Sequence, residues 1–167
     1  MAFTTADAQF LRDKQGKLII KEFAIYFPTF PQDSCMAVTF APPYEKEQVP
    51  DSITKQNNYV TNNLHGLEWN DGEAGYKYVS DILTQMTHNL NVIYVKGTEK
   101  TKVIQSYLPN LRVMNIESLG CPSFKKLPLF DAPCQNEIHT QNPRYCCAVR
   151  NAKRLGIWLQ FYLCLQV

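Results

Sequence analysis

The sequence predicts an α/β domain in which a mixed β-sheet is flanked by helices. Two apolar segments rich in β-branched and aromatic residues come first, with a proline-rich turn between them, which indicates an antiparallel pair of strands. Beyond them, segments with helical periodicity alternate with short, continuously apolar segments, which is typical of strands covered by helices on both faces. The 167 residues suffice for one domain, predicted over 1–167 with its core at about 17–163.

The first half of the chain carries the expected antiparallel pair. Residues 17–27, KLIIKEFAIYF, predict the first strand because Ile and Phe dominate them, and the segment ends before a proline. Residues 35–41 predict its partner, which two prolines close. The polar stretch 44–63 and the turn-rich stretch 65–72 are expected to connect this pair to the second half of the chain.

The second half alternates helices with strands. A helix is predicted around Val79 and Leu83, because apolar side chains recur there at intervals of three and four. Two more helices are expected, at 98–108 and from about 144 to 163. The remaining expectations are short strands at 91–95 and 111–116 and a proline-rich loop at 120–143.

This element order is that of an RNase H-like domain, although several other three-layer folds begin in the same way. Nucleases of that architecture hold two divalent ions with about four carboxylates, which compensate the charge on the attacking and leaving oxygens. The segments where such acids would fall are the strand that contains Glu22, the loop at 97–100 and the start of the last helix at 146–152.

Composition and charge limit the classes of function. The chain has 17 basic and 15 acidic residues, so a net charge of +2 argues against nucleic-acid binding by bulk charge but allows a local basic patch. The N-terminus lacks the pattern of a signal peptide, and no stretch has the length and apolarity of a membrane span. We therefore expect a cytoplasmic or nuclear protein without membrane contact, in which the six cysteines are reduced.

The three acid-bearing segments resemble those of a DEDDh 3′–5′ exonuclease that has lost its acids. The first-strand Asp-x-Glu motif aligns near 22–24, where Glu22 is one acid of two, and Lys100 aligns with a later Asp. In CCAVRNA at 146–152, Cys146 stands in place of the motif's His and Asn151 in place of its Asp. A cation and an amide remove most of the charge that would bind magnesium. No catalytic residue is therefore predicted.

A more specific similarity is to the RNase H-like domain of the Maelstrom family, which acts in small-RNA (piRNA) silencing. Glu22 in IIKEFA, Cys134, His139 in EIHTQNPRYCCA and Cys147 match the Glu-Cys-His-Cys set with which that family chelates zinc. The resemblance implies zinc held by Glu22, Cys134, His139 and Cys147. Two thiolates, an imidazole and a carboxylate are suitable tetrahedral ligands, and such a closed site is structural because no position is left for water.

The histidine and cysteine assignments have alternatives. Cys134 and His139 are separated by four residues where about two are expected from the family, so Cys121 or Cys146 could replace Cys134. Without a metal, Cys147 would be half-buried, Cys146 buried and His139 a surface residue. His65 is expected to hydrogen-bond within its loop, with a general base as the alternative.

Basic residues near the expected cleft suggest a nucleic-acid-binding patch, although lysines on helices are more often simply solvated. The predicted contact residues are Lys96, Lys100, Lys102 and Arg150. The expected function is a non-catalytic or weakly catalytic, zinc-stabilised domain that binds RNA, another single strand or a silencing-pathway protein. One alternative is an active metal-dependent exonuclease that uses Glu22, Glu99 and Glu117; another is a virus- or transposon-derived protein-interaction module.

Overall fold

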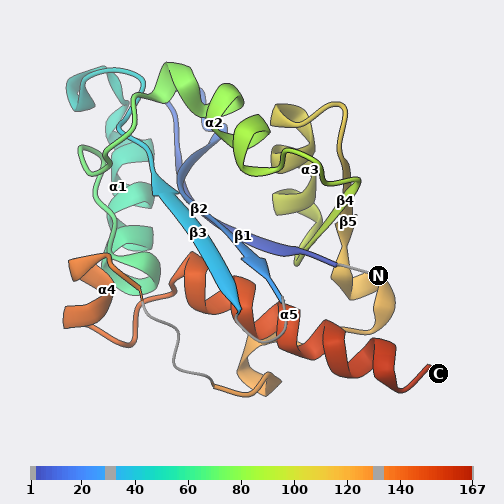
Figure 1. Ribbon diagram of the computed structural model, residues 1–167. Coiled ribbons are helices and arrows are strands. Elements are labelled where there is room, and N and C mark those ends of the chain that lie inside the picture. Colours follow the sequence, from blue (N-terminus) through green and yellow to red (C-terminus); the bar gives the residue numbers. More distant parts are fainter. Residues whose placement is uncertain (1–2, 29–32, 130–133, 167) are drawn as a thin grey trace.

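A computed structural model describes residues 3–28, 33–129 and 134–166 (Figure 1). One five-stranded sheet has the order β3-β2-β1-β4-β5. β1 pairs antiparallel with β2, β2 pairs antiparallel with β3, and β4 and β5 continue the sheet in parallel. The strands are β1 (Thr5–Arg12), β2 (Leu18–Phe27), β3 (Ser34–Thr39), β4 (Val92–Val95) and β5 (Arg112–Asn115). The predicted α/β class with a helix-flanked mixed sheet is confirmed.

Helices cover both faces of the sheet. α5 (Ala148–Cys164) crosses one face and packs on β1 and β2, as Figure 1 shows. On the other face, side chains of α2 (Val79–Met86) and α3 (Thr98–Tyr107) join those of β1, β2 and β4 in the largest core cluster. The described residues also form the α-helices α1 (Asp51–Val60) and the short α4 (Glu137–Gln141), besides several short 3-10 or π-helical turns. Among the described residues, no helix combines the length and apolarity that crossing a bilayer requires.

The central strand, β1, lies before the predicted start of the fold. The segment 17–27 was predicted to be the first strand but is the second, and the prediction missed Thr5–Arg12 altogether. β1 was not predicted because the acid Asp7 and the amide Gln9 interrupt its apolar residues. Both side chains are nevertheless buried. The core cluster consequently includes Ala6 and Ala8.

Two predicted connections contain helices. The polar stretch 44–63 holds α1, which Asn57 fixes to β1: its side-chain oxygen accepts from the Arg12 amide at 2.8 Å and its nitrogen donates to the Arg12 carbonyl at 2.9 Å. The predicted loop 120–143 contains α4. The last helix begins at Ala148, after the predicted 144.

A β-bulge in β2 changes which side chains face each side of the sheet. Gln9 pairs with Glu22 and Phe10 with Ile20, so Lys21 is the extra residue between two regular stretches of the ladder. Because of it, Ile20 and Phe23 point into the same core although three positions separate them. The Lys21 ammonium is buried and donates to the backbone carbonyl oxygens of Trp69 and Asp71.

Gly156 lies where α5 packs tightly against the sheet. A Cβ at this position would meet the ring of Tyr26 and the hydroxyl of Thr5. Alanine in place of a helical glycine usually stabilises a protein by about 0.5–1 kcal/mol. Here we expect the opposite: Gly156→Ala should lower the free energy of unfolding by about 1–3 kcal/mol, because the added methyl group overpacks the interface.

Urea denaturation measures this effect, and Gly75→Ala is the matched control. Gly75 has a φ of −61° and is exposed, with Tyr78 ring atoms at 3.4 Å or more from the added carbon. Its substitution should change the unfolding free energy by less than about 0.5 kcal/mol. An unchanged or raised stability of Gly156→Ala would show that α5 does not approach β1 and β2 this closely.

Candidate metal centre

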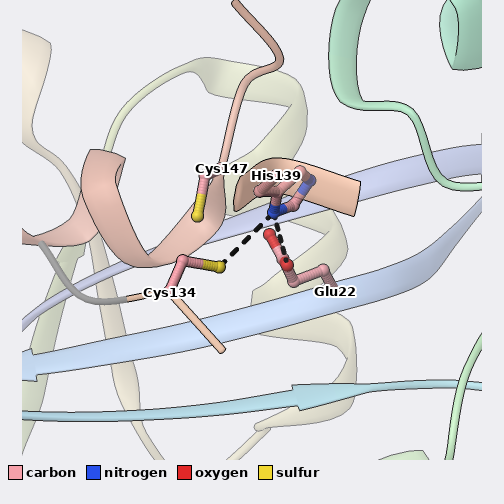
Figure 2. A group of neighbouring side chains, drawn as sticks. All are labelled: Glu22, Cys134, His139 and Cys147. Carbon is pink, nitrogen blue, oxygen red and sulfur yellow. Dashed lines mark hydrogen bonds and ion pairs between the residues drawn. The ribbon is translucent and has the colours of Figure 1, made fainter. Parts of the chain in front are cut away.

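Four potential metal ligands from distant parts of the sequence meet between the sheet and α5 (Figure 2). Glu22 extends from β2, Cys134 precedes α4, His139 lies on α4, and Cys147 is the residue before α5. Each has a solvent-exposed fraction of 9% or less. One ligand atom from each residue lies within 4.8 Å of the other three. The predicted set of Glu22, Cys134, His139 and Cys147 is therefore brought together as one buried cluster that could hold a metal ion such as zinc.

Two separations within the cluster suit a tetrahedral ion. His139 Nδ1 lies 3.5 Å from Cys134 Sγ and 3.4 Å from Glu22 Oε2. Zinc bound at about 2.0–2.3 Å from each ligand places neighbouring ligand atoms about 3.3–3.8 Å apart. The distances from His139 Nδ1 to Cys134 and to Glu22 already have that spacing, and all four ligand atoms lie within 4.8 Å of one another.

The hydrogen bonds of His139 identify the nitrogen that is available to a metal. Its Nε2–H donates to the backbone carbonyl of His65 at 2.8 Å, which directs Nδ1 toward Cys134 and Glu22. A histidine ligand typically donates its other ring N–H to a carbonyl or carboxylate, which fixes the tautomer and the orientation of the ring. His139 has this second partner in place.

His65 carries that carbonyl at the end of the helical turn Thr61–His65, whereas the sequence predicted a hydrogen-bonding histidine in a turn-rich connection. Its Nε2–H donates to the Phe10 carbonyl at 2.8 Å, and its Nδ1 accepts from the Leu67 amide at 3.0 Å. Burial lowers the pKa of His65 to about 4, so the ring is neutral at physiological pH. His65 therefore connects His139 to the central strand, and its buried ring, with both nitrogens in use, is not placed to act as a general base.

The two carboxylate oxygens of Glu22 have different partners. Oε1 accepts from the Ala148 amide at 2.6 Å, at the N-terminus of α5, where a negative charge is favourable. Oε2 faces His139. Glu22 therefore serves as a helix cap while offering its second oxygen to the cluster.

The pKa shifts within the cluster favour a deprotonated Cys134 thiol. The hydrogen bond from the Cys147 thiol, together with His139, lowers the pKa of Cys134 to about 4 against the effect of burial. The same thiol–thiolate bond and burial raise the pKa of Cys147. Burial also raises the pKa of Glu22 to about 7, although His139 and the Ala148 amide act in the opposite direction. Because metal ligands must be deprotonated, loading of the site would release protons.

The alternative cysteines lie elsewhere. Cys121 is buried in a separate apolar cluster with Leu155 and Leu159, and Cys146 is exposed. Of the three candidates for this ligand position, Cys134 is the one that joins Glu22, His139 and Cys147 among the described residues. His139 is fully buried, so the alternative of a surface histidine is wrong.

A second buried polar cluster surrounds Asp7 on β1. Its carboxylate accepts from Lys100 Nζ at 2.6 Å, Asn151 Nδ2 at 2.9 Å and Gln9 Nε2 at 3.3 Å. Asp7 has no exposed surface, and Lys100 is one quarter exposed. A single ammonium and two amides thus surround this carboxylate.

Sequence analysis identified Lys100 and Asn151 but missed the acid they share. It aligned the first acidic motif with Glu22 on β2, whereas the carboxylate facing Lys100 and Asn151 is Asp7 on β1. The signal was present in TADAQFLR, where Asp7 and Gln9 are two residues apart and therefore on one face of a strand. Asp7 was not considered because the strand that carries it was not predicted.

The predicted nucleic-acid contacts do not form one free basic patch. Lys96 is 9% exposed and pairs with Glu117 at 2.9 Å, while Lys100 pairs with Asp7. Arg150 donates to the backbone carbonyls of His139 and Pro143. Lys102 is exposed and lines a different groove, with Arg12 and Lys17.

The acids named for an active nuclease also have separate partners. Glu22 faces His139, and Glu99 lies 3.9 Å from Arg12. Glu117 pairs with Lys96, which lowers the pKa of Glu117.

The fold and the site together define an α/β protein with a buried Glu-Cys-His-Cys cluster able to hold a metal. No protein-family model and no curated protein matches the chain.

Proposed function

We propose that the chain is a degenerate RNase H-like domain of the Maelstrom type, in which zinc has a structural role and RNA is bound without hydrolysis. The observation that carries the proposal is the convergence of Glu22, Cys134, His139 and Cys147, with His139 Nδ1 directed into the cluster. The sheet order and the mixed strand directions are compatible with an RNase H-like fold.

Zinc would link three elements of the fold through one ion. Glu22 belongs to the sheet, Cys134 and His139 to the segment around α4, and Cys147 to the start of α5. Four protein ligands complete a tetrahedron, so the ion would hold these elements together without offering a position to water. The chemistry supplied is charge neutralisation in a buried site, which couples metal binding to folding.

The surroundings of Asp7 support the non-catalytic part of the proposal. A two-metal nuclease needs several carboxylates around its ions, whereas Asp7 is bonded to the Lys100 ammonium and the amides of Asn151 and Gln9. One positive charge already compensates this acid. A divalent cation beside it would have to displace Lys100.

A binding and cleavage assay tests the function. We expect the full chain to shift a labelled single-stranded RNA with an affinity that falls steeply as salt rises, and to leave the RNA intact with or without magnesium. Magnesium-dependent 3′–5′ degradation that Glu22→Gln abolishes would overturn the proposal in favour of an active exonuclease. Absence of any salt-dependent shift would instead favour a protein-interaction module.

A further inference from the structure

A groove of about 600 Å³ lies beside the turn between β1 and β2, away from the metal centre. The turn at 13–17 and α3 contribute to its walls, and the segment around Tyr44 and Tyr76 completes it. All its lining residues belong to the described part of the chain. We call it the tyrosine groove, after the lining residues Tyr44, Tyr76 and Tyr107.

Cations lie along the tyrosine groove. Arg12, Lys17 and Lys102 line it, and Lys14 lies at its margin with its ammonium 4.8 Å from the centre of the Tyr44 ring. Lys17 and Lys102 are exposed, and no ion pair is found for either within the described ranges. These two ammonium groups are therefore available to an anionic ligand.

The acids of the groove offset only part of this charge. Asp13 is occupied locally, because its carboxylate accepts from the amides of Gln15 and Lys17 at 2.8 Å each. Glu99 lies 3.9 Å from the Arg12 guanidinium, too far for a strong ion pair. Four cations against two acids leave an excess of positive charge on a chain whose net charge is only +2.

Aromatic and apolar side chains supply the remaining surface. The hydroxyls of Tyr76 and Tyr107 are hydrogen-bonded at 2.6 Å, which holds these two rings in a fixed arrangement. Tyr44 is held by Trp69, with ring centroids 5.5 Å apart, and its hydroxyl accepts from the Lys14 amide. Leu18 and Val103 add aliphatic surface. Rigid aromatic surface bordered by cations is the combination that binds a single strand, since bases stack and phosphates pair.

We propose that the tyrosine groove binds single-stranded RNA, with Lys17 and Lys102 at its phosphates and bases against the tyrosine rings. This inference rests on the proposed RNA-binding function and assigns it to a surface that includes Lys102 of the predicted contacts but not Lys96, Lys100 or Arg150. An acidic protein segment would satisfy the cations, but it would make no use of the aromatic surface. The observations therefore favour the nucleic acid.

The test measures binding of a fluorescent oligouridylate of about 12 nucleotides by anisotropy over a range of salt concentrations. Lys17→Glu with Lys102→Glu should weaken binding about tenfold or more and make the salt dependence shallower, because two phosphate contacts are lost. Lys55→Glu with Lys126→Glu makes the same change in net charge at exposed lysines outside the groove, and it should alter affinity by less than about threefold.

A second variant examines the aromatic surface without changing charge. Tyr107→Leu should weaken binding of the oligouridylate about fivefold or more, with an unchanged salt slope, since stacking and not a phosphate contact is removed. Circular dichroism and thermal unfolding establish that each variant is folded. An unfolded Tyr107→Leu would be replaced by Tyr44→Leu, for which the same loss is expected.

The outcomes distinguish failure of the groove assignment from failure of the proposed RNA-binding function. If wild-type protein binds the oligouridylate and the groove variants bind equally well, the groove assignment is wrong while RNA binding stands. If wild-type protein does not bind, the proposed function itself fails. Retention of affinity in the folded tyrosine variant, with loss in the charge variant, would contradict stacking and identify a site for acidic polymers in general.

Discussion

Cys147→Ser is expected to lose bound zinc and more than about 4 kcal/mol of unfolding free energy, a loss typical of the removal of a metal. Cys147 lies at the junction between α5 and the cluster and is 1% exposed, so water cannot readily replace its sulfur. The other three ligand atoms would remain crowded within 4.8 Å without a cation between them. Elemental analysis gives zinc per chain, and urea denaturation gives the stability.

Two further variants make this test specific. Cys146→Ser changes the neighbouring, exposed cysteine and should keep one zinc per chain and wild-type stability. Glu22→Gln keeps an oxygen that can accept from the Ala148 amide, so it removes the anionic ligand without removing the helix cap. Wild-type protein that contains far less than one zinc per chain, and that unfolds identically after chelation, would refute the metal centre.

The second large effect is expected at Lys100. Lys100→Met should destabilise the protein by about 3–5 kcal/mol, because it leaves the buried Asp7 carboxylate without a compensating charge. Asn151 and Gln9 still donate to Asp7, but two amides do not neutralise an anion that has no exposed surface. Urea denaturation of Lys100→Met and of exposed Lys102→Met compares the buried pair with an ordinary surface lysine.

A double-mutant cycle shows whether the loss comes from the unpaired charge. Asp7→Asn combined with Lys100→Met removes both charges and should recover most of the stability, since replacing a buried pair as a unit is often neutral. If Lys100→Met is no less stable than Lys102→Met, the Asp7–Lys100 pair is not formed. Failure of the double variant to recover would assign the loss to packing of the Lys100 side chain.

Sequence patterns predicted the elements that carry local signals and missed those that depend on distant partners. β2 and β3 were predicted from their β-branched and aromatic residues. β1 was missed because Asp7 becomes acceptable in a strand only when Lys100 and Asn151, far along the chain, satisfy it. α1 was missed for a similar reason: its polar residues gain a fixed position through the two bonds between Asn57 and the Arg12 backbone.

The features of the candidate site likewise fall into those that the sequence revealed and those that it could not reveal. The four ligands were found through resemblance, whereas no spacing rule could have joined Glu22 to Cys147 from the other end of the chain. The His65 carbonyl, which orients His139, belongs to the backbone, so no pattern of residue types could predict its role. For the basic residues, sequence analysis could not show that Lys96 and Lys100 are paired with Glu117 and Asp7.

The bulge at Lys21 makes the metal centre depend on how β2 pairs with β1 as well as on residue identity. Side chains of a strand alternate between faces, so in a regular ladder that retains Lys21, Ile20 and Glu22 would share one face. The bulge instead places Ile20 in the core on one side of the sheet and Glu22 on the other side, against His139 and the start of α5. A variant that closed the bulge while keeping Lys21 would therefore separate Glu22 from His139 with every ligand still present, whereas deletion of Lys21 would leave a regular ladder with Glu22 still facing α5.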